Sequence, residues 1–333
     1  MNPINGRKFL VTGGSGFIGA ALVQRLVAME GRVRVFDSHL RGDPRRLQAV
    51  CHQIELEEGD VRDSTAVMRA AKGCDSIIHL AYLNGTEFFY SKPDLVLEIG
   101  VKGIIHTLDA AIAHKIKDFV LASSSEVYQT PPVFPTPETV PLVVPDVHNP
   151  RFSYGGGKII SELLCVNYGR KLFDRMTIFR PHNVYGPDMG SEHVIPQFIL
   201  RAQKIEQEFS GMEVPFPIQG DGSETRSFIH INDFTDGLIR VIESGGHNEI
   251  YHIGTEEEVP VREVARMILS FFDRRPVFQN VPSAEGGALR RCPDITKLKQ
   301  LGFSPKIPLK TGLEEVCRWY VQNAGLYTSR NQL

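Results

Sequence analysis

The stretch KFLVTGGSGFIGAALVQRLVAME, residues 8–30, decides the fold of this chain. It opens with a short apolar run that glycines close, and it continues with apolar residues at helical spacing, so a strand, a turn and a helix follow one another. Gly13, Gly16 and Gly19 stand in the turn, where free backbone amides at a helix N-terminus suit a pyrophosphate. We interpret this order as the first unit of a nucleotide-binding α/β sheet.

The same rhythm continues through the first half of the chain. Strands are predicted within residues 32–37, 54–63, 74–82 and 116–125, with helical patterns between them, the longest over residues 94–115. Strands and helices that alternate in this way predict a doubly wound parallel sheet of the Rossmann type.

The pattern changes after about residue 180, where glycine and proline become frequent and short elements alternate to the end. We therefore expect an NAD-binding Rossmann domain over residues 1–180, to which a segment near 225–255 returns. A smaller α/β substrate-binding domain is expected over residues 181–333.

The composition is that of an ordinary globular protein. With 333 residues, 42% of them hydrophobic, the chain can bury a large core, and its net charge of −2 gives no general attraction to nucleic acid or acidic membranes. Five scattered cysteines without a C-x-x-C pair favour neither disulfides nor a zinc site. The N-terminus has no signal-peptide pattern, and no apolar run approaches about 18 residues. We expect a soluble, cytoplasmic protein without a metal.

A carboxylate follows the glycine turn where a dinucleotide site needs one. Asp37 ends the second predicted strand, where it can bind ribose hydroxyls and would repel a 2′-phosphate. This predicts NAD rather than NADP, although Arg32, Arg34 and Arg41 lie nearby; alternatively, Asp37 only caps a loop. The residues that we expect to contact NAD, among which Asp60 and Val61 would flank the adenine, are Gly13, Gly16, Phe17, Ile18, Gly19, Asp37, Asp60, Val61, Leu80, Ala81, Tyr154 and Lys158.

Ser124, Tyr154 and Lys158 form a Ser…Tyr-x-x-x-Lys pattern. A spacing of four places Tyr154 and Lys158 on one face of a predicted helix. A phenol with an ordinary pKa of about 10 is a weak base at neutral pH, and a neighbouring lysine favours its ionised form. Ser124 can hold a substrate hydroxyl toward the phenol. We interpret the three residues as catalytic; the alternative is a surface helix pair.

Glu126 stands directly after three serines, in SSSEVY. If the strand stays extended as far as this residue, its period of two turns Ser124 and Glu126 to the same side, at the carboxyl end of a parallel strand. We therefore predict that Glu126 lies in the active site. The alternative is an acidic loop residue beside the proline-rich segment, residues 131–145.

At this point the chain resembles the extended short-chain dehydrogenase/reductases of the NAD-dependent epimerase/dehydratase family, which act on nucleotide sugars. The motifs TGGSGFIG, GDVRD, HLA, SSSEVY, SYGGGK, RPHNVYGP, GDGSETRSFIHINDF and RRCPDITKLKQLGFSPKIPL occur in family order along nearly the whole chain. The resemblance implies tightly held NAD, a nucleoside diphosphate sugar as substrate, and a homodimer. It also implies that Tyr154 removes the proton from a sugar hydroxyl, commonly at C4, while hydride moves to NAD, to give a transient ketosugar.

The same resemblance implies which residues contact the substrate. Arg226 and Arg291 resemble diphosphate-binding arginines, and Asn183 resembles a residue that approaches the sugar diphosphate; each arginine is alternatively a solvated surface charge. The segment NGTEFFY, residues 84–90, is expected to touch the sugar. The full set of predicted substrate contacts is Asn84, Ser124, Ser125, Asn183, Arg226 and Arg291.

Glu126 separates the possible reactions, because a 4-keto group acidifies the protons on both neighbouring carbons. Our first hypothesis is an epimerase in which Glu126 is the base at such a carbon. UDP-glucuronate decarboxylases have a similar Ser-Glu-Val-Tyr arrangement, and GDP-mannose 3,5-epimerase is similar elsewhere but has its catalytic cysteine where Glu126 stands. A dehydratase is a further alternative, although Ser125 replaces its acid. A protein of another class, a non-catalytic NAD sensor, would need neither Tyr154 nor Lys158.

Overall fold

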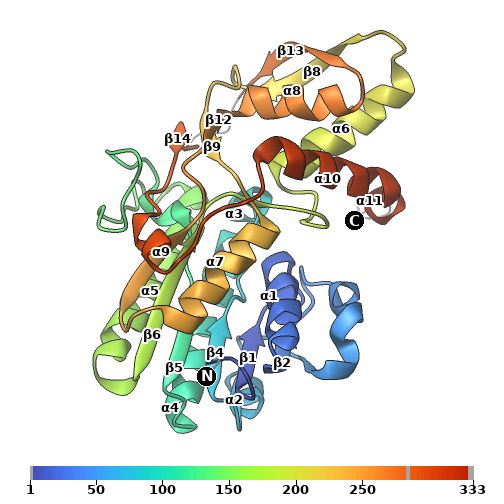
Figure 1. Ribbon diagram of the computed structural model, residues 1–333. Helices are drawn as coiled ribbons and strands as arrows, with labels where there is room; N and C mark the ends of the chain where they lie inside the picture. The colour runs from blue at the N-terminus through green and yellow to red at the C-terminus, as the bar shows by residue number, and fades with distance from the viewer. Residues whose placement is uncertain (1–2, 283–285, 329–333) are drawn as a thin grey trace.

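A seven-stranded parallel sheet forms the centre of the protein, in a computed structural model that describes residues 3–282 and 286–328 (Figure 1). Its strand order is β11-β6-β5-β4-β1-β2-β3, and every neighbouring pair is parallel. The strands are β1 (Lys8–Thr12), β2 (Arg32–Asp37), β3 (Ile54–Glu58), β4 (Ser76–His79), β5 (Asp118–Ala122), β6 (Arg175–Pro181) and β11 (Glu249–Ile253). The order reverses between β1 and β4, which is where doubly wound sheets bind their ligands.

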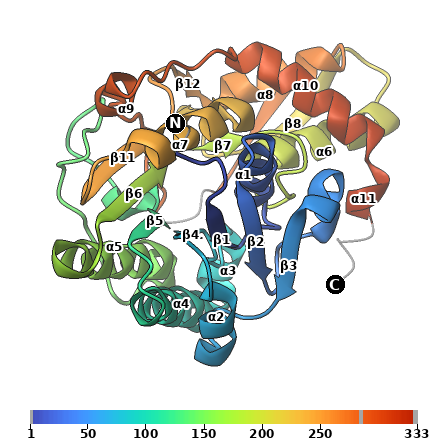
Figure 2. The same cartoon turned by 60° about the horizontal axis from the view of Figure 1, so that its bottom comes forward.

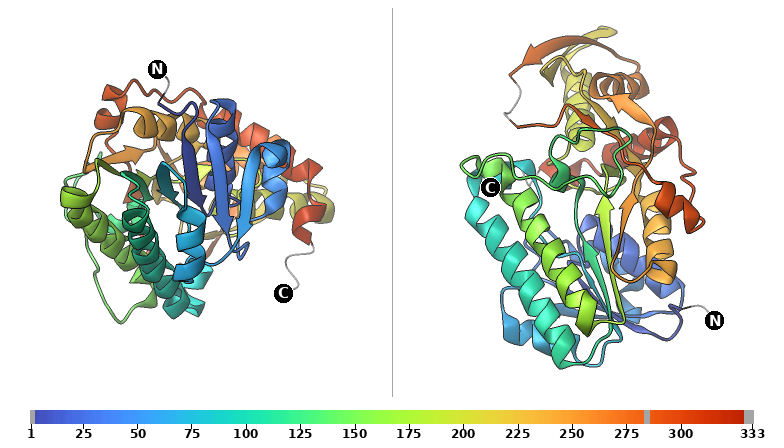
Figure 3. Two further views of the ribbon diagram at one scale, coloured as in Figure 1. Left: turned by 90° about the horizontal axis from the view of Figure 1, so that it is seen from below. Right: turned by 90° about the vertical axis from the view of Figure 1, so that its left-hand side faces the viewer.

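Helices cover both faces of this sheet (Figures 2 and 3). One face carries α1 (Phe17–Ala28) and α7 (Ile231–Ser244), and the other carries α2 (Ser64–Ala71), α4 (Pro93–Ala113) and α5 (Ser153–Leu172). The Rossmann-type fold predicted from the sequence is confirmed. None of the described helices is both long enough and apolar enough to cross a bilayer.

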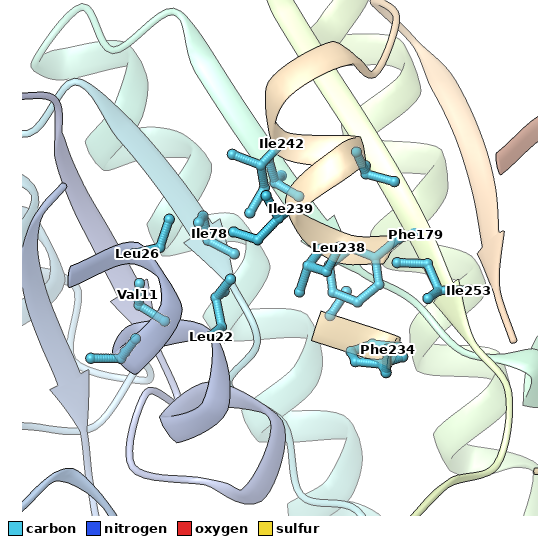
Figure 4. Close-up of a cluster of buried hydrophobic side chains, with 14 of the residues drawn as sticks. Val11, Leu22, Leu26, Ile78, Phe179, Phe234, Leu238, Ile239, Ile242 and Ile253 are labelled. Carbon is cyan, nitrogen blue, oxygen red and sulfur yellow. The ribbon is translucent and has the colours of Figure 1, made fainter. Parts of the chain in front are cut away.

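The core between the sheet, α1 and α7 is made almost entirely of aliphatic and aromatic side chains (Figure 4). Its fully buried members include Val11, Leu22, Leu26, Ile78, Phe179, Phe234, Leu238 and Ile253. Because α7 and β11 come from the second half of the chain, this core joins residues that are far apart in sequence. The chain thus leaves the sheet after β6 and returns to it at residues 231–253.

Most of the remaining elements gather above the carboxyl ends of the strands (Figure 1), whereas a short helix at residues 296–300 packs beside α7 and β11. The others form small sheets, β7 with β10, β8 with β13, and β9 with β12 and β14, and helices pack with these sheets around a second core. Their bounds are α3 (Thr86–Ser91), β7 (Val184–Tyr185), α6 (Val194–Glu208), β8 (Glu213–Gln219), β9 (Thr225–Ser227), β10 (Ile229–His230), β12 (Glu258–Pro260), α8 (Val261–Phe271), β13 (Arg275–Val281), β14 (Arg290–Arg291), α9 (Thr296–Gln300), α10 (Leu309–Gln322) and α11 (Gly325–Thr328). The predicted ends of the two domains, residues 1 and 333, lie outside the described residues.

Candidate active site

The Tyr-x-x-x-Lys pair lies in the first turns of α5, against the end of β5. The ammonium of Lys158 donates a hydrogen bond to the carbonyl of Ala122 at 2.7 Å and lies 5.7 Å from the centroid of the Tyr154 ring. Ser124, two residues beyond β5, hydrogen-bonds with the Tyr154 side chain. The structure therefore brings Ser124, Tyr154 and Lys158 together as the sequence pattern indicated.

Burial sets the acidity of both α5 residues. Burial raises the pKa of Tyr154 above its usual value of 10, although the hydrogen bond from Ser124 and the charges of Arg41 and Arg291 partly oppose this. Burial lowers the pKa of Lys158 to about 7, against the opposing charge of Glu162. Tyr154 is thus a neutral phenol in the protein alone, and its use as a base depends on added positive charge.

The three glycines between Tyr154 and Lys158 have distinct surroundings. A Cβ at Gly155 would lie 2.9 Å from the carbonyl oxygen of Glu126, and one at Gly157 would lie 2.0 Å from the hydroxyl oxygen of Tyr82. Gly156 would meet only an ordinary contact, with Val144 at 3.5 Å. Two of the three glycines therefore let other parts of the active site approach α5.

Glu126 reaches the site by a different route from the one expected. Extension ends at Ser124, whose side chain accepts a hydrogen bond from the Glu126 amide at 3.1 Å and caps a 3-10 helix over Ser125–Tyr128. The strand therefore does not stay extended as far as Glu126, because the serine side chain satisfies the amide and turns the backbone. The Glu126 carboxylate nevertheless lies close enough to Tyr154 to affect its pKa.

An arginine cluster surrounds the Glu126 carboxylate. Its oxygen Oε1 lies 2.7 Å from Nη1 of Arg291 and 3.6 Å from Nη2 of Arg151, and Arg226 is directly opposite Arg291 in the β9–β14 pair. Burial alone would raise the pKa of Glu126, but these three arginines outweigh it and lower the pKa to about 2. Arg291, predicted to face a diphosphate, is thus held by Glu126, and its buried Nε has no partner among the described residues.

The glycine turn is built for close backbone approach. Gly13 has a φ of +71°, and a Cβ there would lie 2.8 Å from the amide nitrogen of Ala81, while one at Gly19 would lie 2.2 Å from the Gly13 carbonyl oxygen. The buried carboxylate of Asp37 accepts hydrogen bonds from the amides of Ser15 and His39, each at 2.9 Å. A glycine-rich turn beside a buried carboxyl group fits the pyrophosphate and ribose of NAD. When bound, NAD supplies a hydride acceptor.

The arginines near Asp37 have other partners. Arg34 pairs with Glu55 at 2.6 Å, Arg41 pairs with Glu192 at 2.8 Å, and Arg32 donates to the Gly6 carbonyl at 3.0 Å. None of these contacts offers a cation to a 2′-phosphate, which is consistent with NAD.

The other predicted contacts are more dispersed. Asp60 pairs with Arg62 at 2.7 Å, Val61 is buried against α4, and Leu80 and Ala81 follow β4. Asn84 is exposed, Ser125 is buried, and the Asn183 amide donates to the Ser227 carbonyl at 3.1 Å. In the part of the chain that the structure describes, no group of three or more His, Cys, Asp or Glu side chains is placed to hold a metal.

Sequence reasoning did not single out two aromatic residues beside Tyr154. Phe89 of α3 stacks on the Tyr154 ring with centroids 4.8 Å apart, and Tyr82 meets it edge-on at 5.0 Å. Phe89 lies within NGTEFFY, the segment expected to touch the sugar, and Tyr82 directly follows HLA, but neither motif shows which side chain turns toward α5.

Comparison with known proteins decides the family. The model of the NAD dependent epimerase/dehydratase family matches residues 9–254, which span the glycine turn, Ser124, Tyr154 and Lys158. The chain belongs to the NAD-dependent epimerase/dehydratase family. It is therefore an enzyme of a family that uses NAD, and the predicted cofactor is confirmed.

Relatives within the family catalyse different reactions. UDP-glucuronic acid decarboxylase 2 of Arabidopsis thaliana is 32% identical over 92% of this chain and 67% of its own length. dTDP-4-dehydro-6-deoxy-D-allose reductase of Streptomyces bikiniensis is 30% identical over 95% of this chain and 96% of its own. Among solved structures, dTDP-glucose 4,6-dehydratase of Streptomyces venezuelae, with NAD bound, has a TM-score of 0.87 at 29% identity and covers 97% of this chain and 99% of its own.

Proposed function

We propose that the protein is a nucleotide-sugar epimerase that works through a transient 4-keto sugar. The observation that carries this proposal is the meeting of Glu126 with Tyr154, Ser124 and Lys158 in one buried site. Tyr154 takes the proton of the C4 hydroxyl, which Ser124 orients. Glu126 then takes a proton from a carbon beside the ketone to give an enediolate, and water delivers a proton to the other face of that carbon. NAD supplies the hydride acceptor and, at the end, the donor.

Substrate binding supplies the basicity that Glu126 lacks in the protein alone. A carboxylate with a pKa of about 2 is a weak base, because Arg291 and Arg151 hold its charge. Two carboxylates, Glu126 and Glu224, act on the three arginines, so the cluster keeps an excess of positive charge that suits a diphosphate. When the diphosphate shares these guanidinium groups, Arg291 holds Glu126 less strongly and the pKa of Glu126 rises. The base is therefore strengthened only with substrate bound.

A decarboxylase is the second candidate, and the Glu126–Arg291 ion pair is the observation that favours it. Loss of carbon dioxide from a 4-keto uronic acid needs no carbon base, so a weakly basic Glu126 would suffice. The surplus arginine charge would then hold the sugar carboxylate. The 32% identity to UDP-glucuronic acid decarboxylase 2 supports this candidate as well.

The product distinguishes the candidates. The first step is to identify any nucleotide sugar that the purified protein retains, and to add UDP-glucuronate, UDP-glucose, GDP-mannose and dTDP-glucose as further probes. Reactions run in deuterated water are then followed by NMR and by carbon dioxide release. Epimerisation with deuterium at a carbon beside C4 supports the proposal. Carbon dioxide release shows a decarboxylase, and loss of water or net consumption of NADH contradicts both candidates.

The enzyme is also proposed to act as a homodimer, in which α4 and α5 form the interface. These two helices lie side by side along one flank of the molecule (Figure 3). Large apolar side chains of both helices are exposed there: Leu97, Ile105, Ile112, Ile160 and Leu163. Pairing of the same surfaces in a symmetric dimer would remove them from water.

A further inference from the structure

The ring of Tyr82 covers the ammonium of Lys158. Tyr82 follows shortly after β4, and Nζ of Lys158 lies 4.1 Å from the centroid of its ring. The same ring meets the ring of Tyr154 edge-on, with centroids 5.0 Å apart and planes at 81°. A cation held against an aromatic face away from water is stabilised by the charge distribution of the ring. One side chain therefore contacts both members of the Tyr-x-x-x-Lys pair.

Two helices have glycine where they meet this ring, and glycine lowers the stability of a helix interior. A Cβ at Gly100, inside α4, would lie 2.2 Å from the hydroxyl oxygen of Tyr82, and one at Gly157, inside α5, would lie 2.0 Å from it. Glycine weakens a helix interior relative to alanine. The Tyr82 hydroxyl is itself buried without a partner among the described residues, which adds a further penalty. Helix stability alone does not explain a tyrosine at this position.

We propose that Tyr82 is a positioning residue of the active site, whose ring face holds the charged Lys158 and whose edge fixes the ring of Tyr154. This inference rests on the proposed function in one respect, namely that Tyr154 and Lys158 perform the chemistry. Lys158 acts through its positive charge, which favours the ionised form of Tyr154. A side chain that keeps Lys158 charged in a buried place thereby strengthens the base.

Other groups also favour the charged form of Lys158, and a change at Tyr82 leaves them in place. The Ala122 carbonyl accepts a hydrogen bond from the ammonium at 2.7 Å, and the charge of Glu162, itself paired with Arg180 at 2.6 Å, raises the pKa of Lys158. Burial lowers the pKa of His79 to about 3 and raises the pKa of Cys165, so both are neutral at ordinary pH.

Tyr154 also has neighbours other than Lys158 and Tyr82. These are the hydroxyl of Ser124, the charges of Glu126, Arg41 and Arg291, and the stacked ring of Phe89. They act on the phenol directly, so a change at Tyr82 leaves them in place. An effect of Tyr82 on the acidity of Tyr154 must therefore pass through Lys158 or through the edge contact between the two rings.

The test compares Tyr82→Phe, which keeps the ring face, with Tyr82→Leu, which removes it. Both are prepared with NAD bound, and ionisation of Tyr154 is followed by tyrosinate absorbance against pH, as the difference from the same protein carrying Tyr154→Phe. Without the ring, Lys158 loses support for its charge and the Tyr154 phenolate is harder to form. We expect the Tyr154 titration to move upward by about one pH unit in Tyr82→Leu and to stay at the wild-type position in Tyr82→Phe.

A rescue variant separates this role from simple packing. Gly100→Ala is added to Tyr82→Leu, where the tyrosine hydroxyl no longer blocks the new methyl group. The double variant should regain thermal stability relative to Tyr82→Leu while keeping the shifted titration. Recovery of the wild-type titration together with stability would overturn the proposal, because packing alone would then explain the effect. The proposal would also be overturned if the Tyr154 titration had the same midpoint in Tyr82→Leu and Tyr82→Phe, or if neither variant showed a Tyr154 titration.

Failure of this inference is distinguishable from failure of the proposed function. If Tyr154→Phe keeps full activity on the identified nucleotide sugar, the catalytic assignment is wrong, whatever the titrations show. If Tyr154→Phe is inactive and the Tyr154 titration is the same in Tyr82→Leu as in wild type, only the positioning role of Tyr82 is wrong.

Discussion

The carboxylate of Glu126 meets the guanidinium of Arg291 at 2.7 Å, although the two residues stand 165 positions apart. Glu126 comes from the turn after β5 of the large sheet, and Arg291 comes from β14 of a small sheet above it. The pair forms only when both parts of the chain are folded together. The free energy of unfolding should therefore depend on whether the Glu126 carboxyl is ionised.

Removal of the phenol hydroxyl should stop the chemistry and leave binding intact. Tyr154→Phe keeps the ring that stacks on Phe89, but it loses the proton acceptor. We expect the rate of turnover to fall by roughly 10³-fold, with unchanged NAD content of the purified protein. Activity is measured on the identified nucleotide sugar, and cofactor content by absorbance after denaturation. Turnover within a few-fold of wild type would contradict the assignment.

The Glu126 carboxyl should make the protein sensitive to acid over a defined range. Its folded pKa of about 2 lies below the ordinary value of 4.5, so its stabilising contribution is present above pH 4.5 and is lost as pH falls through 2. This contribution is roughly 3 kcal/mol by linkage. Because Glu126→Gln cannot titrate, its free energy of unfolding should fall less steeply between pH 4.5 and 2 than that of wild type, as measured by urea denaturation. Equal slopes would mean that the Arg291 ion pair does not depress the acidity of Glu126.

Adjacent glycines of α5 should respond to alanine in opposite directions. Gly156→Ala adds a methyl group with only an ordinary contact to Val144, and it should stabilise the protein by about 0.5–1 kcal/mol. Gly157→Ala forces the Tyr82 ring to move, and it should destabilise by roughly 1–3 kcal/mol. Urea denaturation of the two variants provides the comparison. If both substitutions stabilised the protein, the Tyr82 ring could move away from residue 157 without a loss of stability.

The dimer interface can be tested on one exposed residue with a matched control. Leu163→Glu, on α5, places a charge on the proposed interface, while Val277→Glu, on β13, places one on an equally exposed apolar residue elsewhere. Sedimentation equilibrium should show a wild-type dimer whose dissociation constant rises at least about tenfold in Leu163→Glu and stays constant in Val277→Glu. A monomer at all concentrations in wild type would refute the proposal.

Local sequence patterns were enough to predict most of the fold and part of the candidate site. The glycine turn, Asp37, and the Tyr154–Lys158 spacing are each set by residues near one another, so the sequence predicted their arrangement. The strand predicted within residues 116–125 ends at Ala122, because the Ser124 side chain accepts a local hydrogen bond that competes with extension.

Contacts between distant segments could not be predicted in the same way. Arg291 reaches Glu126 only because β14 pairs with β9. Tyr82 reaches Lys158 only because two helices carry glycine at facing positions, Gly100 and Gly157. Neither pairing leaves a periodic signal in a single sequence.

The most direct test of the central claim, that Tyr154 and Glu126 act in successive steps, is the reaction of Glu126→Gln with the identified nucleotide sugar in deuterated water. NADH absorbance and carbon-bound deuterium are measured together on the same sample. Because the amide keeps the shape of the side chain but cannot take a proton, we predict that NADH still forms transiently while deuterium incorporation is lost. If Glu126→Gln incorporates deuterium and turns over as fast as wild type, Glu126 is not the base and the account is contradicted.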